Sequence, residues 1–242
     1  AIVKIVQQIP AGVPPVAEIR ERVVEAIKRE RAEQQVTDKA KALVAQGVDV
    51  LDFASGQPDF DPPDHAKAAA EAAIRTGFTK YTPSSGTDEL RHAIAKKLEA
   101  DHGLRYDKSQ ILVSCGAKHS LYNLAEAFYE AGDEVIIPTP YWVSYSDQVL
   151  LNDATPVFLP TVEEEGYAIA RTRLESVITP RSKAIIVNSP CNPTGAMYDR
   201  ATLEVIADVA LRHDLLIVSD EIYEKICYDG ITQTSIASLS PD

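Results

Sequence analysis

Two short apolar runs, each followed at once by polar residues, most constrain how this chain can fold. Uninterrupted aliphatic runs of this length are typical of strands that are buried on both faces of a parallel sheet. Open sheets of this kind bind ligands in the crevice beyond the carboxyl ends of their strands. The polar residues after the two runs are therefore candidates for one common site. The runs are Ala184–Val187, before S-P-C-N-P-T-G at 189–195, and Leu215–Val218, before S-D-E-I-Y at 219–223.

Expected strands and helices alternate along much of the chain, which predicts a three-layer α/β/α fold with a mostly parallel sheet. Cap-like Thr37-Asp38 and Gly47, for example, mark the two ends of one helix. The expected strands are Val48–Phe53, Ile111–Ser114, Glu134–Ile137, Thr155–Leu159, Ala184–Asn188 and Leu215–Ser219. The expected helices are Thr37–Gln46, His65–Thr76, Asp88–His102, Lys118–Tyr129, Trp142–Leu151, Arg173–Ile178 and Arg200–His213.

The composition narrows the class of protein. A formal net charge of −12 argues against a nucleic-acid partner, because binding to phosphates needs clustered Lys and Arg. No apolar stretch approaches the ~20 residues of a membrane span, and the first residues lack a signal-peptide pattern. The three cysteines and five histidines lack metal-ligand spacing, so we expect no metal site. A protein of the reducing cytoplasm is the simplest expectation.

Six motifs along the chain carry a resemblance to one family. In chain order they are V-L-D-F-A-S-G-Q-P-D-F (50–60), K-Y-T-P-S-S-G-T-D-E-L-R (80–91), S-C-G-A-K-H-S-L (114–121), P-Y-W-V-S-Y (140–145), N-S-P-C-N-P-T-G (188–195) and S-D-E-I-Y-E (219–224). With these motifs the chain resembles the N-terminal part of a class I, fold-type-I pyridoxal-phosphate aminotransferase, most like the bacterial aspartate aminotransferases. The resemblance implies an incomplete large domain, pyridoxal phosphate as the cofactor, and an amino acid, preferably aspartate-like, and a 2-oxo acid as substrates.

A glycine between an expected strand and an expected helix is the candidate phosphate site. Free N–H groups and the dipole at a helix start suit a phosphate, and Gly116 permits close backbone approach. By itself this pattern is also typical of a structural turn. The resemblance assigns Gly116, Ala117 and Lys118 to the cofactor phosphate. It also places Trp142, the single tryptophan, on the face of the cofactor ring, where a core or surface aromatic is the alternative.

The polar strand ends supply candidate groups around the ring. Asp220 is expected to face the ring nitrogen, because a buried carboxylate keeps a pyridinium protonated and makes the cofactor an electron sink. Asn192 and Tyr223 are expected to donate to the phenolic oxygen. Without the family, Asn192-Pro193 is a turn signal and Asp220 a helix N-cap, so both alternatives stay open. The resemblance makes Asp220 and Tyr223 the catalytic candidates, and it places Trp142 and Asn192 against the substrate as well.

Two further residues are assigned by the resemblance alone. Tyr81, in K-Y-T-P, is expected to cross the interface of a homodimer and reach the phosphate of the neighbouring subunit. Gly56, in S-G-Q-P-D-F, is expected in a loop that covers the substrate. A surface tyrosine and a turn glycine are the alternatives.

The first 35 residues cannot be placed by the resemblance. Val16–Gln35 is rich in Glu, Arg and Ala, and an apolar stripe of Ile19, Val23 and Ile27 predicts an amphipathic helix. The segment is open to interpretation as a dimer arm, a tag-like or engineered piece, or a replacement for part of the family's small domain. The expected division is residues 1–35, residues 36–60 as the start of the family-like region, and residues 61–242 as the first part of the cofactor-binding large domain.

One residue of the family has no counterpart in the sequence. The Schiff-base lysine of the family lies beyond the D-E-I-Y segment, and the chain stops at Asp242 before that lysine would appear. It also stops before the family's arginines for the phosphate and the substrate carboxylate. Lys225 is the only lysine after Asp220, and it does not follow a strand. We therefore expect the chain alone to be inactive. The competing hypothesis is a non-catalytic α/β module that binds the cofactor weakly or serves in assembly.

Overall fold

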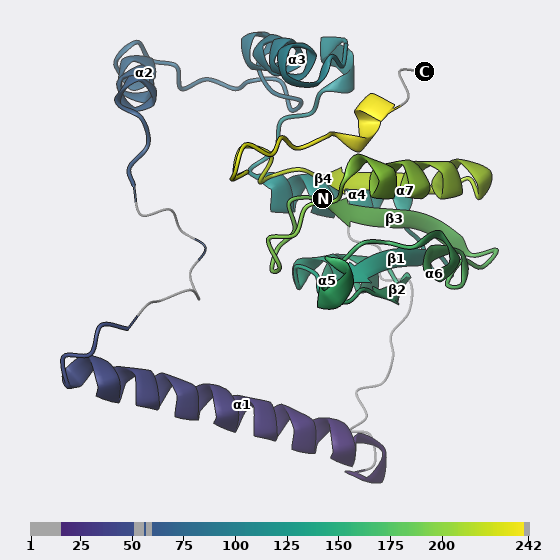
Figure 1. Ribbon diagram of the computed structural model, residues 1–242. Coiled ribbons are helices and arrows are strands. Elements are labelled where there is room, and N and C mark those ends of the chain that lie inside the picture. Colours follow the sequence, from purple (N-terminus) through teal and green to yellow (C-terminus); the bar gives the residue numbers. More distant parts are fainter. Residues whose placement is uncertain (1–15, 51–55, 57–59, 240–242) are drawn as a thin grey trace. The chain divides into compact units, whose positions relative to one another are not determined.

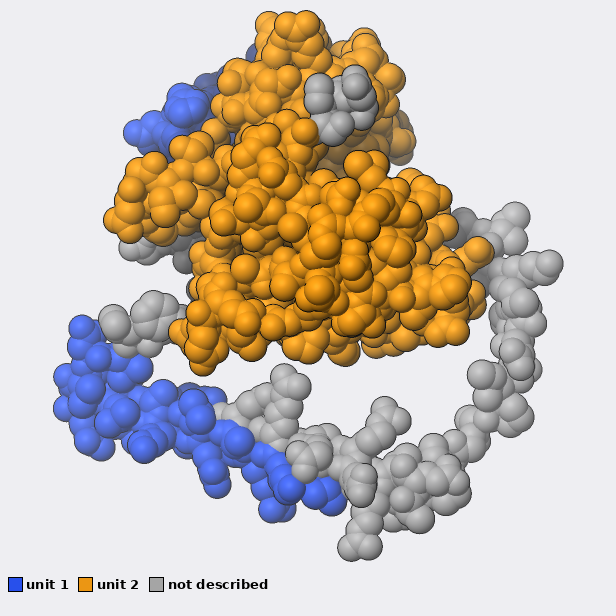
Figure 2. Space-filling model, turned by 45° about the vertical axis from the view of Figure 1, so that its right-hand side comes forward, with its two compact units in different colours: residues 1–78 blue, residues 79–242 orange. Residues whose placement is uncertain are grey.

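The computed structural model describes residues 16–50, 56 and 60–239, which fall into two compact units. Figure 2 shows residues 1–78 in blue and residues 79–242 in orange. The first unit contains helices α1 (Val16–Ala45) and α2 (Asp64–Arg75), and the second contains the sheet (Figure 1). The division expected at residues 35 and 60 stays a prediction.

Helix α1 continues through the point at which a new helix is expected at Thr37. That expected helix start is wrong, because Thr37 and Asp38 lie within the helix, and the Gln34 side chain donates to Asp38 Oδ1 over 2.9 Å. No glycine or proline interrupts residues 16–45, so nothing in the backbone favours a break there. The expected helix end is confirmed, since Gly47 follows α1 with a φ of +77°.

The rest of the first unit confirms one expected helix and corrects one expected strand. Helix α2 matches the helix expected from His65 and has no buried residue. Residues 48–50 form no strand, because the Val48 N–H donates back to the Leu43 carbonyl over 3.1 Å and so completes the end of α1. Residues 51–53 of the same expected strand lie outside the described residues.

Four parallel strands form the sheet of the second unit, in the order β2-β1-β3-β4. Their bounds are β1 (Glu134–Thr139), β2 (Thr155–Pro160), β3 (Ser182–Asn188) and β4 (Leu216–Asp220). Each lies within two residues of an expected strand, so these four predictions are confirmed. The strand expected at Ile111–Ser114 is wrong: the Val113 N–H donates to the Ser85 carbonyl over 3.0 Å, and Leu112 is 59% exposed.

Helices cover both faces of the sheet, which confirms the three-layer α/β/α class. The side chains of β1 alternate between two apolar clusters, with Val135 and Ile137 in one and Ile136 in the other. The first cluster includes residues of α5 (Ser144–Leu150) and of α4 (Ala117–Phe128) with its C-cap, Tyr129; the second includes α6 (Arg171–Glu175) and α7 (Arg200–Arg212). All three β1 side chains are fully buried, as expected for a central strand.

One further helix and three short turns complete the described elements. Helix α3 (Asp88–His102) begins where the Thr87 hydroxyl accepts from the Leu90 N–H, and Gly103 follows its end with a φ of +71°, as the sequence predicts. The 3-10 turns are η1 (Lys108–Gln110), η2 (Glu163–Glu165) and η3 (Ile236–Leu239). None of the helices within the described ranges combines the length and the apolar character needed to cross a membrane.

Candidate functional site

The carboxyl ends of three neighbouring strands place the candidate residues at one edge of the sheet. From β1 the chain passes to β2 on one side and then to β3 on the other. The order in which the parallel strands join the sheet therefore reverses between β1 and β3. Ligands of open α/β sheets bind outside such a reversal point. At the last pair of β3 and β4, Asn188 lies directly opposite Asp220.

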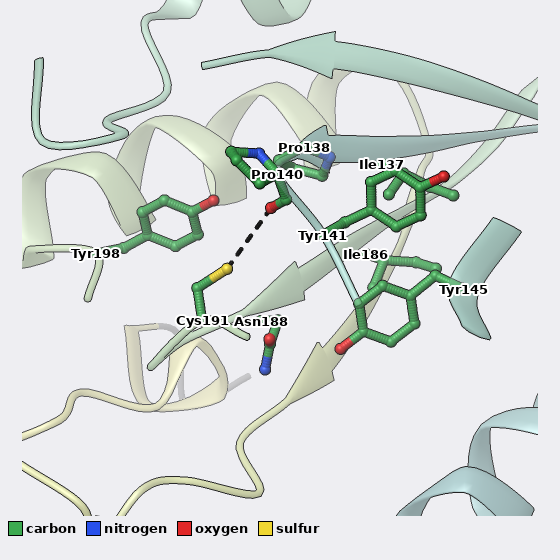
Figure 3. Close-up of a pocket in the computed structure, with 9 residues that line it drawn as sticks. All are labelled: Ile137, Pro138, Pro140, Tyr141, Tyr145, Ile186, Asn188, Cys191 and Tyr198. Atoms are coloured by element: carbon green, nitrogen blue, oxygen red, sulfur yellow. Dashed lines mark hydrogen bonds between the residues drawn. The ribbon is translucent and has the colours of Figure 1, made fainter. Parts of the chain in front are cut away.

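A small pocket opens at this reversal point (Figure 3). Its walls come from the ends of β1 and β3, the segments that follow them, and helix α5. The Cys191 thiol donates to the Pro140 carbonyl over 3.7 Å and so joins the segment after β3 to the segment after β1. The lining residues are Ile137, Pro138, Pro140, Tyr141, Tyr145, Ile186, Asn188, Cys191 and Tyr198.

Asp220 is a buried carboxylate with both oxygens engaged. Asp220 is only 8% exposed. The Tyr145 hydroxyl donates to Oδ2 over 2.7 Å, and the Ile222 N–H donates to Oδ1 over 3.2 Å. The alternative of a helix N-cap is wrong, because the residues after Asp220 form a turn rather than a helix. A buried carboxylate held by donors keeps its charge in place for a cationic partner.

The segments after β3 and β4 are joined by two asparagines. Asn188 donates from Nδ2 to the Asp220 carbonyl over 2.9 Å, and its Oδ1 accepts from the Asn192 N–H over 2.8 Å. The Asn192 amide then donates to the Tyr223 hydroxyl over 3.4 Å. The structure thus brings Asn192 and Tyr223 together, as expected for two groups that share one acceptor.

Trp142 connects the start of α4 to the Asp220 network. The Lys118 ammonium lies 4.9 Å from the centre of the Trp142 ring, within the range of a cation–π interaction. Trp142 also meets the Tyr145 ring edge to face, with centroids 5.4 Å apart and planes at 86°. A chain of contacts therefore runs from Lys118 through Trp142 and Tyr145 to Asp220.

The first turn of α4 is open at its N-terminus. Gly116 precedes the helix with a φ of +90°, no side chain caps the helix, and a Cβ at Gly116 would have no neighbour within 4 Å. Uncapped N–H groups at a helix start favour an anion, and the ammonium of Lys118 adds positive charge in the same turn. The His119 ring serves the loop before the helix, because its Nδ1 accepts from the Cys115 N–H over 3.1 Å.

Comparison with known proteins reveals the family. The model for aminotransferase class I and II matches residues 48–242. The chain belongs to this family. It is 49% identical over 207 residues to an aspartate aminotransferase of Geobacillus stearothermophilus, and the match covers 86% of this chain and 53% of that relative. A Petunia hybrida bifunctional aspartate aminotransferase and glutamate/aspartate-prephenate aminotransferase is 51% identical over 205 residues, covering 84% of this chain and 43% of the relative.

Solved aminotransferase structures share the fold. A single mutant of the Thermus thermophilus aspartate aminotransferase matches with a TM-score of 0.80 at 43% identity, over 86% of this chain and 54% of that one. An aspartate aminotransferase from Rhizobium meliloti matches with a TM-score of 0.79 at 42% identity, over 86% and 52% of the two chains. The chain spans about half the length of the relatives it matches.

Aminotransferases of this family use pyridoxal phosphate, and the described site fits that cofactor. The fit rests on the chemistry of three groups at the sheet edge. A buried carboxylate suits a pyridinium, an uncapped helix start suits a phosphate, and an amide beside a phenol suits an anionic oxygen. These groups are Asp220, Gly116–Lys118 and the pair Asn192 with Tyr223.

Tyr81 and Gly56 are assigned by the aminotransferase resemblance alone. Tyr81 is fully exposed on the second unit, with its role at a subunit interface still a prediction. Gly56 belongs to the first unit, where a Cβ would meet nothing within 4 Å. Most of its motif, residues 51–55 and 57–59, lies outside the described residues. The expected role of Gly56 against the substrate therefore also stays a prediction.

Lys225, the lysine that follows Asp220 in this chain, is held by an ion pair with a residue of α3. Its Nζ donates to Asp101 Oδ2 over 2.8 Å, and this hydrogen bond raises the pKa of Lys225. Glu224 accepts from both Lys97 and His102 of α3. The carboxylates and His102 are close enough to share a metal ion, but the two lysines already compensate the two negative charges. Sequence spacing does not reveal this cluster, since its halves are more than 120 residues apart.

Tyr145 is one of two site residues, with Asn188, that the motifs do not single out. It ends the P-Y-W-V-S-Y motif, three residues after Trp142. That spacing puts both side chains on one side of a helical turn, which is the available signal. Its partner Asp220 is 75 residues away, and only the folded sheet brings the two together.

Proposed function

We propose that this chain supplies the cofactor-binding part of an aminotransferase that transfers an amino group between an amino acid, preferably aspartate-like, and a 2-oxo acid. The observation that carries the proposal is the Asp220 carboxylate, buried at the carboxyl end of β4 and fixed by donors on both oxygens. Relatives named as aspartate aminotransferases support the reaction class and the preferred amino donor.

Asp220 has the central chemical role in this proposal. When bound, pyridoxal phosphate supplies an electron sink for the electron pair released at the substrate Cα. The Asp220 carboxylate holds the proton on the ring nitrogen, which a neutral side chain at the same place could not do. Asn192 and Tyr223 donate to the phenolic oxygen, and their mutual contact of 3.4 Å supports a shared acceptor.

The remaining groups orient the cofactor. The N–H groups at the start of α4, with Lys118, hold the phosphate. The Trp142 indole covers one face of the ring, and Lys118 and Tyr145 both contact that indole. Trp142 and Asn192 are also the residues we assign to the substrate. Two anchors and one flat wall together determine how a planar ligand lies in the site.

For the 242-residue chain by itself we propose binding without a covalent bond to lysine and without turnover. Lys118 lies over the Trp142 ring and Lys225 pairs with Asp101, so neither is placed as an imine-forming lysine. For this length of chain, the positions of the two lysines favour the second candidate function. That function is a non-catalytic module that binds the cofactor weakly or serves in assembly. The two candidates differ in whether the protein at its encoded length catalyses transfer.

Binding can be measured directly, because Trp142 is the single tryptophan of the chain. Titration with pyridoxamine phosphate, which lacks the aldehyde and so cannot attach to surface lysines, should quench the fluorescence of Trp142 with saturation. Transamination from aspartate to a 2-oxo acid should then be assayed with the protein at the length its gene encodes. Saturable binding with turnover supports the enzyme, and binding without turnover supports the cofactor-binding module. No binding refutes both of these and leaves only the role in assembly.

We also propose a cytoplasmic homodimer. Tyr81 is a fully exposed aromatic side chain and is therefore accessible to a second copy of the chain. The cysteines Cys115, Cys191 and Cys227 are free thiols, which supports a reducing compartment. Sedimentation at micromolar concentrations should reveal dimers that weaken on Tyr81→Ala. A monomer at all concentrations would rule out the homodimer.

A further inference from the structure

Tyr145 is a buried donor in contact with two of the groups that the proposed function uses. The residue lies in α5 and is 2% exposed. Its hydroxyl donates to Asp220 Oδ2 over 2.7 Å, and its ring meets Trp142 edge to face at 5.4 Å. No other feature of the described site joins the carboxylate and the indole through one side chain.

The environment of the Tyr145 hydroxyl favours its protonated form, which donates to Asp220. Burial, followed by the negative charge of Asp220, raises the pKa of Tyr145 far above its ordinary value. The group therefore acts as a donor to the carboxylate. Its environment is fixed as well, because its ring packs in the apolar cluster with Val149 and Ile137.

The two oxygens of Asp220 have unequal partners. Oδ2 receives the short bond from Tyr145, whereas Oδ1 receives a longer one of 3.2 Å from the Ile222 N–H in the same turn. The bond from Ile222 is local to the turn that follows β4. Tyr145 is the partner from another element, and it determines how the carboxylate plane is oriented relative to the α5 face of the sheet.

We infer that Tyr145 is a positioning residue that orients the Asp220 carboxylate and the Trp142 indole together and keeps the negative charge on Asp220. The inference rests on the proposed function, since it concerns the same cofactor. A donor on a carboxylate stabilises its ionised form. With the hydroxyl present, a proton shared by Asp220 and the ring nitrogen stays on the nitrogen. Without it, that proton moves toward the carboxylate oxygen, and no other group gains or loses a proton.

The test uses Tyr145→Phe in the 242-residue chain, with pyridoxamine phosphate carrying 15N in its ring as the probe. Loss of the hydroxyl should raise the dissociation constant about tenfold to a hundredfold, the range expected for one hydrogen bond to a charged group. The 15N chemical shift of the bound ring should move toward that of neutral pyridine. A purely structural role for Tyr145 would leave that chemical shift unchanged.

Tyr129→Phe is the matched control, because Tyr129 belongs to the same apolar cluster and loses the same hydroxyl away from the site. Tyr145→Leu removes the ring too, and should further change the emission of Trp142 in the absence of ligand. Thermal unfolding of each variant identifies loss of fold. If Tyr145→Leu unfolds, the comparison of Tyr145→Phe with Tyr129→Phe still tests the positioning role of Tyr145.

The outcomes separate the two proposals. If the unaltered chain binds the probe and Asp220→Asn weakens binding, while Tyr145→Phe matches Tyr129→Phe in affinity and in 15N chemical shift, the role of Tyr145 is refuted and the proposed function stands. If the unaltered chain does not bind the probe, the proposed function fails and the inference fails with it. A changed 15N chemical shift in Tyr145→Phe alone supports the positioning role.

Discussion

The two faces of the sheet are built from different side chains. Beneath α6 and α7 the cluster is aliphatic, with Ile136, Ile185 and Leu203 among its fully buried members. Beneath α4 and α5 the cluster includes the buried Tyr145, with the partly buried Trp142 packed against it. The α6–α7 face therefore holds the sheet together, whereas the α4–α5 face also presents polar and aromatic groups at the strand ends.

The starts of the long helices differ between the faces in the same way. Helix α7 begins at Asp199, whose side chain accepts from the Thr202 N–H over 2.8 Å. Helix α4 begins at Gly116, and no side chain caps it. A cap satisfies N–H groups that would otherwise be available to a ligand. Stability and binding should thus respond separately to substitutions on the two faces.

The largest expected effect is on stability, from Ile206→Ala on the α6–α7 face. Ile206 is fully buried in α7, and removal of its side chain leaves a cavity in the aliphatic cluster. We expect a loss of about 2–5 kcal/mol in the free energy of unfolding, measured by urea denaturation. Ile206→Val, the control, should cost only about 0.5–1.5 kcal/mol. A changed dissociation constant for pyridoxamine phosphate in the folded Ile206→Ala variant would contradict the separation of the faces.

Asp220→Asn should weaken binding of pyridoxamine phosphate rather than lower the free energy of unfolding. The amide has nearly the same shape and can still accept from Tyr145, but it cannot hold the pyridinium proton. We expect binding weaker by about 1.5–3 kcal/mol, the contribution of a hydrogen bond to a charged group, and loss of most transamination in the enzyme at its encoded length. Asp208→Asn is the control, because Asp208 is an exposed acid on α7 paired with Arg171 and Arg212. Equal affinities of the two variants would remove Asp220 from the site.

The sheet could be predicted closely because its strands are continuous apolar runs. Residues 184–188 and 215–219, for example, correspond to β3 and β4 within two residues. The pattern fails where an apolar run has no partner strand: at residues 111–114, Ile111 is buried while Leu112 is exposed, with no ladder beside them in the described structure. Thr37-Asp38 fails for a different reason, because cap-forming residues are tolerated within a helix when nothing else ends it.

The candidate site could be predicted in part. Asn192, Tyr223, Asp220, Trp142 and Lys118 were recognisable from motifs, and the structure places them in contact with one another or through Asn188 and Tyr145. The two connecting residues were not predicted, because hydrogen bonds between segments depend on the strand order. That order, β2-β1-β3-β4, is a property of the whole sheet and not of any one motif.

The smallest expected effect comes from Asp199→Ala at the start of α7. The Asp199 carboxylate accepts a hydrogen bond from the Thr202 N–H. This bond lowers the pKa of Asp199 below its ordinary value of 3.8. Because the folded-state pKa is lowered, the ionised cap stabilises the fold fully above pH 3.8, and this contribution is lost as the pH falls through the folded-state pKa. We expect Asp199→Ala to cost about 1 kcal/mol in unfolding free energy at pH 7. The difference from the unaltered chain should persist at pH 5 and shrink below pH 3.8, in urea titrations at each pH. Binding of pyridoxamine phosphate should not change, because α7 lies on the face without the site. A weaker affinity in this variant would show that the two faces are coupled.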